Sequence, residues 1–222
     1  MKNEQSWISR HITLHDHADA KAERENALTH ALGIVGALLF TGIVLFRKNS
    51  YIHTRTWVGM LIYAGTLLLL YTSSTLYHHV PKSDAKRIFR LLDHANIYLL
   101  IAGTYSPILL FIGNPGSIRV LYIVWTVALL GILFSLIFWG KLKILHVLFY
   151  LAMGWMMFLF WNDIVPYIPS GLLPWILAAG LTYTIGVIFY AKKDMPHNHM
   201  IWHLFCIVAS ALFCIGFLIY LH

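Results

Sequence analysis

The chain has 222 residues, of which 59% are hydrophobic and only 11% are charged, and its mean hydropathy is +0.70. Soluble domains carry about 25% charged residues, so this composition excludes an ordinary soluble domain and predicts a membrane protein. The formal net charge is +7, but the basic residues lie in several short segments rather than in one block, which does not favour nucleic acid as a partner.

The first 26 residues contain no apolar core followed by a small-residue cleavage site, so we expect a cytoplasmic N-terminal segment and no removable signal peptide. A helical span needs roughly 20 apolar residues, and seven segments approach this length between residue 27 and the end of the chain. They are 27–46, 56–77, 94–113, 118–139, 145–161, 171–190 and 200–221. The pattern predicts an all-α membrane protein, with residues 27–222 forming one seven-transmembrane helix bundle.

The basic residues indicate how this bundle is oriented. One set lies in the N-terminal tail and the second, fourth and sixth joins between spans: Lys2, Arg10, Lys21, Arg24, Lys82, Lys86, Arg87, Arg90, Lys141, Lys143, Lys192 and Lys193. The opposite joins contain only Arg47, Lys48, Arg55 and Arg119. Because cytoplasmic loops carry the excess of Lys and Arg, we expect the N-terminus inside, the C-terminus outside, and contact with anionic lipid headgroups.

The only cysteines, Cys206 and Cys214, lie eight residues apart on the last predicted span. That spacing separates them by about 12 Å along a helix, which is beyond disulfide reach. We therefore expect no disulfide, and the cysteines do not indicate a compartment.

Polar residues converge at the expected cytoplasmic ends of three spans. His78 ends the second span, Asp93 begins the third, and His199 and His203 open the seventh. The i, i+4 spacing of His199 and His203 places them on one helical face, and Ser74 stands in the same relation to His78. The three imidazoles suit zinc (Zn²⁺), and three protein ligands leave a fourth position for water, as in catalytic sites.

In this interpretation His78, His199 and His203 are the metal ligands. Asp93 could hold the water by a hydrogen bond and act as its base, and Ser74 could contact the water or the substrate. Purely structural interpretations stay open. The histidine pair could form hydrogen bonds between helices, Asp93 could cap the third span and Ser74 could be a small packing residue. However, ionisable groups inside a membrane are costly, so a cluster of them indicates function.

Other polar residues receive weaker assignments. His79 lies about 100° around the helix from His78, and we expect His94 and His197 to be interfacial rather than ligating. The tail histidines His11, His15 and His17 receive no role. Glu25, Asn26 and His30 either cap the first span or line the same cavity, and capping is the favoured interpretation.

Four stretches, "ENALTHALG", "SSTLYHH", "LLDHANIYLLIAGTYSP" and "MPHNHMIWHLF", resemble the haemolysin III proteins of bacteria, which belong with the progestin and adiponectin (adipoQ) receptors in one seven-span family. The resemblance places that family's S-x-x-x-H motif on Ser74 and His78, its aspartate on Asp93 and its H-x-x-x-H pair on His199 and His203. It implies a cytoplasmic-side zinc site of three histidines, with the aspartate bridging through water. It also implies similarity to alkaline ceramidases. The chain departs from many relatives at Phe213, where they carry a histidine.

The residues and the family resemblance together suggest three functions, of which the third comes from the family name. The first is a zinc-dependent hydrolase of a lipid amide or ester in a bacterial plasma membrane. The second is a membrane sensor in which zinc holds the second, third and seventh spans together and a lipid or partner changes their packing. The third is a pore-forming cytolysin, which seven membrane-inserted spans disfavour because a secreted toxin needs a soluble form. Ligand type alone does not separate zinc from iron or nickel.

Overall fold

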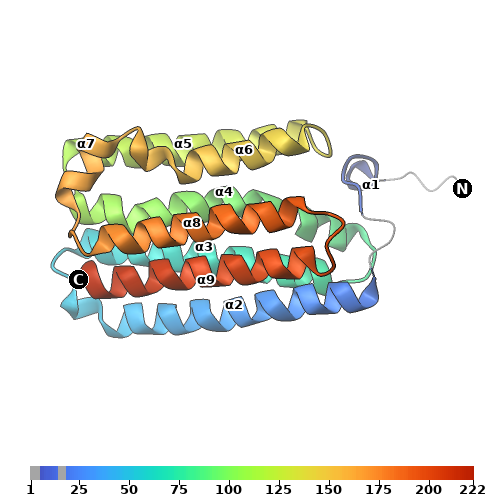
Figure 1. The fold of residues 1–222 in the computed structure, drawn as a ribbon, viewed down its shortest axis with the longest axis horizontal. Coiled ribbons are helices and arrows are strands. Elements are labelled where there is room, and N and C mark those ends of the chain that lie inside the picture. Colours follow the sequence, from blue (N-terminus) through green and yellow to red (C-terminus); the bar gives the residue numbers. More distant parts are fainter. Residues whose placement is uncertain (1–5, 15–18) are drawn as a thin grey trace, which may run out of the picture.

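The computed structural model describes residues 6–14 and 19–222, in which every regular element is a helix. Six helices are long and apolar enough to cross a membrane: α2 (Ala20–Phe46), α3 (Thr54–His79), α4 (Asp84–Ile112), α5 (Pro115–Ile137), α8 (Leu172–Ala191) and α9 (Asn198–Tyr220). They match six of the seven predicted spans and confirm an all-α membrane protein. The six helices run lengthwise beside one another, and α2 begins at the end of the bundle opposite the C-terminus (Figure 1).

The first span begins earlier than expected. The α2 helix begins at Ala20, where the Asp19 side chain caps it by accepting a hydrogen bond from the Lys21 N–H. Glu25, Asn26 and His30 therefore lie inside the helix, so the capping interpretation is wrong, and the boundary expected after residue 26 falls within α2. Residues 20–25 are alanines and charged residues with good helix propensity, whereas hydropathy detects only the apolar part of a helix.

The fifth predicted span is not one helix. The α6 helix (Lys143–Gly154) has 12 residues and is about 18 Å long. Three short elements follow it: η2 (Met156–Phe158), α7 (Trp161–Ile164) and η3 (Val165–Tyr167). The continuous helix expected over 145–161 is therefore wrong. Together, α6 and α7 run along α5 from one end of the bundle to the other (Figure 1).

A tyrosine from another helix forms hydrogen bonds with the backbone groups that are left without helical partners where α6 ends. The Tyr105 hydroxyl of α4 lies 3.1 Å from the Met153 carbonyl oxygen and 2.9 Å from that of Gly154. The same hydroxyl accepts a hydrogen bond from the Met157 N–H at 3.0 Å. Irregular backbone at membrane depth requires internal partners of this kind, so a buried tyrosine on α4 makes the interruption possible.

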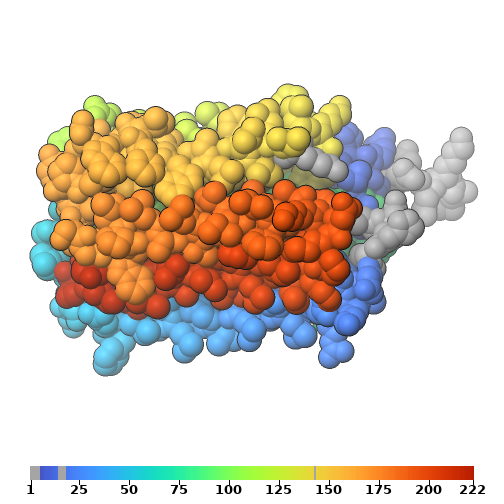
Figure 2. Space-filling view, in the orientation of Figure 1, coloured from blue at the N-terminus to red at the C-terminus, as the bar shows by residue number. Residues whose placement is uncertain are grey.

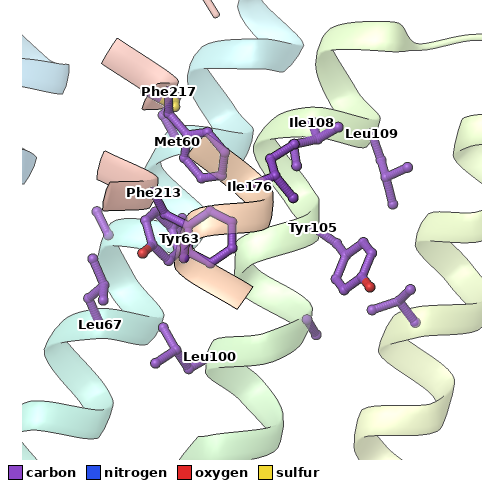
Figure 3. Packing of buried hydrophobic residues seen from close by; sticks show 14 of the residues in the cluster. Met60, Tyr63, Leu67, Leu100, Tyr105, Ile108, Leu109, Ile176, Phe213 and Phe217 are labelled. Carbon is purple, nitrogen blue, oxygen red and sulfur yellow. The ribbon is translucent and has the colours of Figure 1, made fainter. Parts of the chain in front are cut away.

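The hydrophobic core extends through the bundle, with buried side chains from α2, α3, α4, α5, α6, α8 and α9. Tyr63 of α3 packs edge-on against Phe213 and Phe217 of α9, with ring centroids 6.5 and 5.4 Å away (Figure 3). Its hydroxyl donates to the Ser210 carbonyl at 3.3 Å. Side chains fill the space between the α8 and α9 ribbons on the face that Figure 2 shows. The bundle is thus closely packed through its middle, and this packing fixes the ends of α3 and α9 relative to one another.

A glycine allows α3 to approach α4. A Cβ at Gly59 would lie 2.8 Å from both Pro107 Cα and the Ser106 carbonyl oxygen, whereas a Cβ at Gly65 of the same helix would meet no atom within 4 Å. We expect Gly59→Ala to lower the free energy of unfolding by about 1–3 kcal/mol, because backbone atoms cannot move aside easily. Gly65→Ala should be neutral or stabilising by up to about 1 kcal/mol.

Thermal unfolding of the two variants in detergent would check this expectation. Equal midpoints for Gly59→Ala and Gly65→Ala would contradict the close approach of the two helices.

The tail segment lies at the end of the bundle where α2 begins. The α1 helix (Trp7–His11) is joined to α4 through the Ser6 hydroxyl, which donates to Asp84 Oδ2 at 2.7 Å. His11 stacks on Trp7 with ring centroids 4.3 Å apart. Lys2, His15 and His17 lie outside the described residues. Cys206 and Cys214 are both free thiols, as their spacing predicted.

Candidate metal centre

The structure brings His78, His199 and His203 together. His78 lies in the last turn of α3, and the other two lie in the first two turns of α9. Each offers one ring nitrogen, and these three nitrogens all lie within 4.8 Å of one another. His79 and His197 are exposed and do not join this group. Two helices remote in sequence therefore present three imidazoles that could hold one metal ion.

The hydrogen bonds of His203 identify its free nitrogen. Its Nδ1 lies 3.1 Å from the Thr29 hydroxyl and 3.2 Å from the Asn26 carbonyl oxygen. The Thr29 hydroxyl already donates to the Asn26 carbonyl at 2.8 Å. Both neighbours of Nδ1 therefore act as acceptors, so Nδ1 carries the proton and Nε2 keeps a lone pair available for a metal.

The other two histidines have nitrogens with no hydrogen-bond partner. His78 Nε2 and His199 Nε2 are both buried and unpaired, while His78 Nδ1 lies 3.2 Å from Glu23 Oε1. A buried polar atom without a partner costs roughly 1–3 kcal/mol, and coordination to a metal would satisfy both atoms. Three neutral imidazoles with free nitrogens are a donor set that fits zinc.

Ser74 is fully buried one turn before His78, and its hydroxyl has no hydrogen-bond partner. Helical serines and threonines commonly donate to a carbonyl one turn earlier. Ser73 and Thr75 do so, to Leu70 and Tyr71 respectively. Of the three consecutive hydroxyl residues 73–75, Ser74 alone has no hydrogen-bond partner, so its hydroxyl is available to a ligand.

Asp93 lies in the third turn of α4, which begins at Asp84 and is capped by Ser83, so the capping interpretation of Asp93 is wrong. Its Oδ2 is 3.9 Å from His94 Nδ1, and the side chain is 13% exposed. Within residues 6–14 and 19–222, no hydrogen bond joins Asp93 to the three histidines. Direct contact with the histidines is therefore not the role of this carboxylate, and its part in holding a water molecule stays a prediction.

His30 packs against the histidine group, which agrees with the less favoured of the two sequence interpretations, that it lines the same cavity. Its ring stacks on His203 with centroids 3.5 Å apart, and both of its nitrogens are buried and unpaired. Glu23, Asn26 and His30 are spaced i, i+3, i+7, which places them on one helical face. This polar stripe was the signal that could have assigned Asn26 and His30 to the site rather than to a cap, and could have added Glu23 to them.

The chain resembles known proteins over most of its length. A family model described as Haemolysin-III related matches residues 18–214. Hemolysin-3 of Bacillus cereus is 34% identical, with 89% of this chain and 91% of that protein covered. The Hemolysin-3 homolog of Bacillus subtilis (strain 168) is 37% identical, with 89% and 94% covered. The Monocyte to macrophage differentiation factor of Homo sapiens is 30% identical, with 84% and 79% covered. The chain therefore belongs to the haemolysin III-related family, as its motifs predicted.

Proposed function

We propose that this chain is an intramembrane zinc-dependent hydrolase that cleaves a lipid amide or ester, with His78, His199 and His203 as the ligands. The observation that carries this proposal is the arrangement of three imidazole nitrogens within 4.8 Å of one another, with no fourth protein ligand among the described residues. Structural zinc sites normally have four protein ligands, whereas catalytic sites have three. Zinc in such a site supplies a Lewis acid that polarises a carbonyl and makes water more acidic.

The surrounding side chains can supply the remaining chemistry. Asp93, whose side chain is 13% exposed and makes no hydrogen bond to the three histidines among the described residues, can accept the proton of the attacking water. The unpaired hydroxyl of Ser74 can donate to the substrate carbonyl oxygen as negative charge develops there. Both groups are held by helices rather than by loops, so they are positioned before the substrate binds.

An apolar cavity supports a lipid as the substrate. A cavity of about 120 Å³ lies between α4, α6, α8 and α9, and its lining includes Leu100, Ile176, Val187, Trp202 and Phe213. The Trp202 ring lies 5.8 Å from the ring of Tyr190, which in turn lies 5.8 Å from the ring of His199, so one aromatic ring separates the cavity lining from the histidine group. Hydrocarbon is the chemistry that an apolar lining accepts, and a lipid could enter sideways between the helices.

We also propose an orientation of the bundle, with the histidine end on the cytoplasmic side of the membrane. The broken α6 and α7 run would form a seventh crossing, with Tyr105 satisfying its interrupted backbone. The joins at the histidine end would then face the cytoplasm of a bacterial cell by the positive-inside rule. A membrane-impermeant thiol reagent applied to intact cells should label Ile52→Cys and spare Lys192→Cys. The reverse pattern would contradict this orientation.

The test of the proposed activity is a hydrolysis assay with purified protein. Zinc-loaded protein, the same protein stripped by a chelator and the re-loaded protein would each be incubated with a panel of amide and ester lipids. We expect fatty acid release only from the two loaded samples. Stoichiometric zinc with no product from any lipid would contradict the hydrolase.

A membrane sensor with structural zinc is the second candidate, because the site connects helices that are remote in sequence. His203 of α9 is bonded to Asn26 and Thr29 of α2 and would share the metal with His78 of α3. In a sensor, removal of zinc would loosen the packing of these helices, and no turnover would be lost. The same assay, followed by thermal unfolding with and without chelator, separates the two candidates.

The names of the bacterial relatives suggest haemolysis as a third activity. Against a secreted pore-former, large apolar side chains are exposed along the helices of this chain, including Leu32 and Leu39 of α2 and Leu129 and Leu133 of α5. Such a surface requires lipid around it. Release of haemoglobin by purified protein without any lipid product would favour lysis over hydrolysis.

A further inference from the structure

We infer that Glu23 and Lys86 are positioning residues that fix the imidazole of His78 for metal binding, an inference that rests on the proposed metal centre. The two oxygens of the Glu23 carboxylate have different partners. Oε1 lies 3.2 Å from His78 Nδ1, and Oε2 lies 2.6 Å from Lys86 Nζ. The Lys86 side chain is 9% exposed, and that of His78 is 3% exposed.

The Glu23 carboxylate determines which nitrogen of His78 is free. An ionised carboxylate only accepts hydrogen bonds, so His78 Nδ1 must be the donor and must carry the proton. The lone pair then lies on Nε2, which is buried and has no partner. Carboxylates bonded to the far nitrogen of a metal-binding histidine fix the ring orientation and make the ligand more basic.

Lys86 in turn holds Glu23 against the helix that carries His78. Besides Glu23, its ammonium donates to the Tyr77 carbonyl at 2.8 Å and to the Val80 carbonyl at 3.1 Å. All three of its donor positions are therefore used. Both carbonyls lie at the end of α3, where a cation also complements the negative helix end. Lys86 belongs to α4 and Glu23 to α2, so the two residues link three helices around one ligand.

A structural ion pair and a positioning pair make different demands on the protein. If the pair serves only folding, its loss should lower the stability of the metal-free protein and leave the zinc affinity of the folded molecules unchanged. If it positions His78, its loss should weaken zinc binding in protein whose metal-free unfolding midpoint is preserved. Lys86 should act on the His78 ring through Glu23, since its other two bonds are to backbone carbonyls of Tyr77 and Val80 and it has no bond to a histidine ring in the described part of the chain.

Zinc affinity measured by competition with a chelator in detergent tests this inference in Glu23→Gln, Lys86→Met and the double variant. We expect Glu23→Gln to weaken zinc binding about 10- to 100-fold, as other partners of metal-bound histidines do. Lys86→Met should weaken binding in the wild-type background and change it by less than about twofold in the Glu23→Gln background, because the two residues act in series.

Glu25→Gln is the matched control. Glu25 lies two residues further along α2 and pairs at 2.6 Å with His197, which is exposed and outside the histidine group. Its zinc affinity should stay within about twofold of the wild type. Unfolding of each metal-free variant would be followed in parallel.

The outcomes separate this inference from the proposed function. Wild-type protein that binds no stoichiometric zinc removes the metal centre itself. Wild-type protein that binds zinc, together with a Glu23→Gln variant of equal affinity, overturns the positioning role and leaves the metal centre intact. If Lys86→Met lowers zinc affinity equally in the wild-type and the Glu23→Gln backgrounds, the positioning role is also overturned. If Glu23→Gln does not fold, Lys86→Met and Glu23→Asp in the same assay decide the matter: unchanged affinity in both overturns the inference.

Discussion

His203→Ala is expected to reduce zinc binding by at least about 100-fold, because it removes one of three ligands and leaves two, one short of the minimum for catalytic zinc. His203 is also the most constrained ligand, since the Asn26 carbonyl and the Thr29 hydroxyl both fix its ring. Metal content per chain after purification, measured by mass spectrometry, checks this expectation. One zinc per chain in the wild type should become substoichiometric in the variant.

Thermal unfolding gives an independent measurement of the same loss. Zinc present at 100 times its dissociation constant stabilises the folded state by about 2.7 kcal/mol, so a chelator should lower the unfolding midpoint of the wild type. The same chelator should leave His203→Ala unchanged. His79→Ala is the control, because His79 adjoins His78 but is exposed and outside the group. A full zinc complement in His203→Ala would contradict the ligand assignment.

Asp93→Asn is expected to lower the rate of lipid hydrolysis by about 10²- to 10⁴-fold, the contribution typical of a general base. An amide of the same shape cannot accept a proton from water near neutral pH. Zinc content should be unchanged, because Asp93 is not one of the three potential metal ligands. Fatty acid release and metal content, measured on the same preparation, test both parts.

Asp163→Asn provides the comparison for Asp93→Asn. Asp163 lies in α7 and pairs with Arg119 at 3.3 Å, remote from the three histidines. Its hydrolysis rate should match that of the wild type. An Asp93→Asn variant with normal turnover would remove the proposed base, and one that had lost its zinc would assign Asp93 a role in binding the metal.

Sequence alone was sufficient for six of the spans, because uninterrupted apolar runs of this length have few alternatives to a membrane helix. The sequence also predicted that His78, His199 and His203 lie close together, and the structure groups them. The i, i+4 spacing in α9 fixed two of them on one face, and the alternation of short joins placed the end of α3 at the same end of the bundle. The inference needed only chain order and helix geometry.

The features that sequence reasoning missed depend on contacts between remote helices. The end of α6 at Gly154 depends on the hydroxyl of Tyr105, which lies about 50 residues earlier and gives no local signal. Lys86 looked like one of several basic residues in a cytoplasmic join, but it is buried against Glu23 and two α3 carbonyls. For His30 the sequence left cavity lining as the less favoured alternative to capping, since its stacking on His203 depends on how α2 packs against α9.

The most direct test of the metal centre is the X-ray absorption spectrum of zinc bound to the purified protein. Three histidine ligands and one water should give only nitrogen and oxygen neighbours at about 2.0–2.1 Å, with the outer-shell scattering of imidazole rings. Cys206, one turn beyond His203 in α9, is the nearest alternative donor on that helix. A sulfur neighbour at about 2.3 Å, or a spectrum without imidazole scattering, would contradict the three-histidine site.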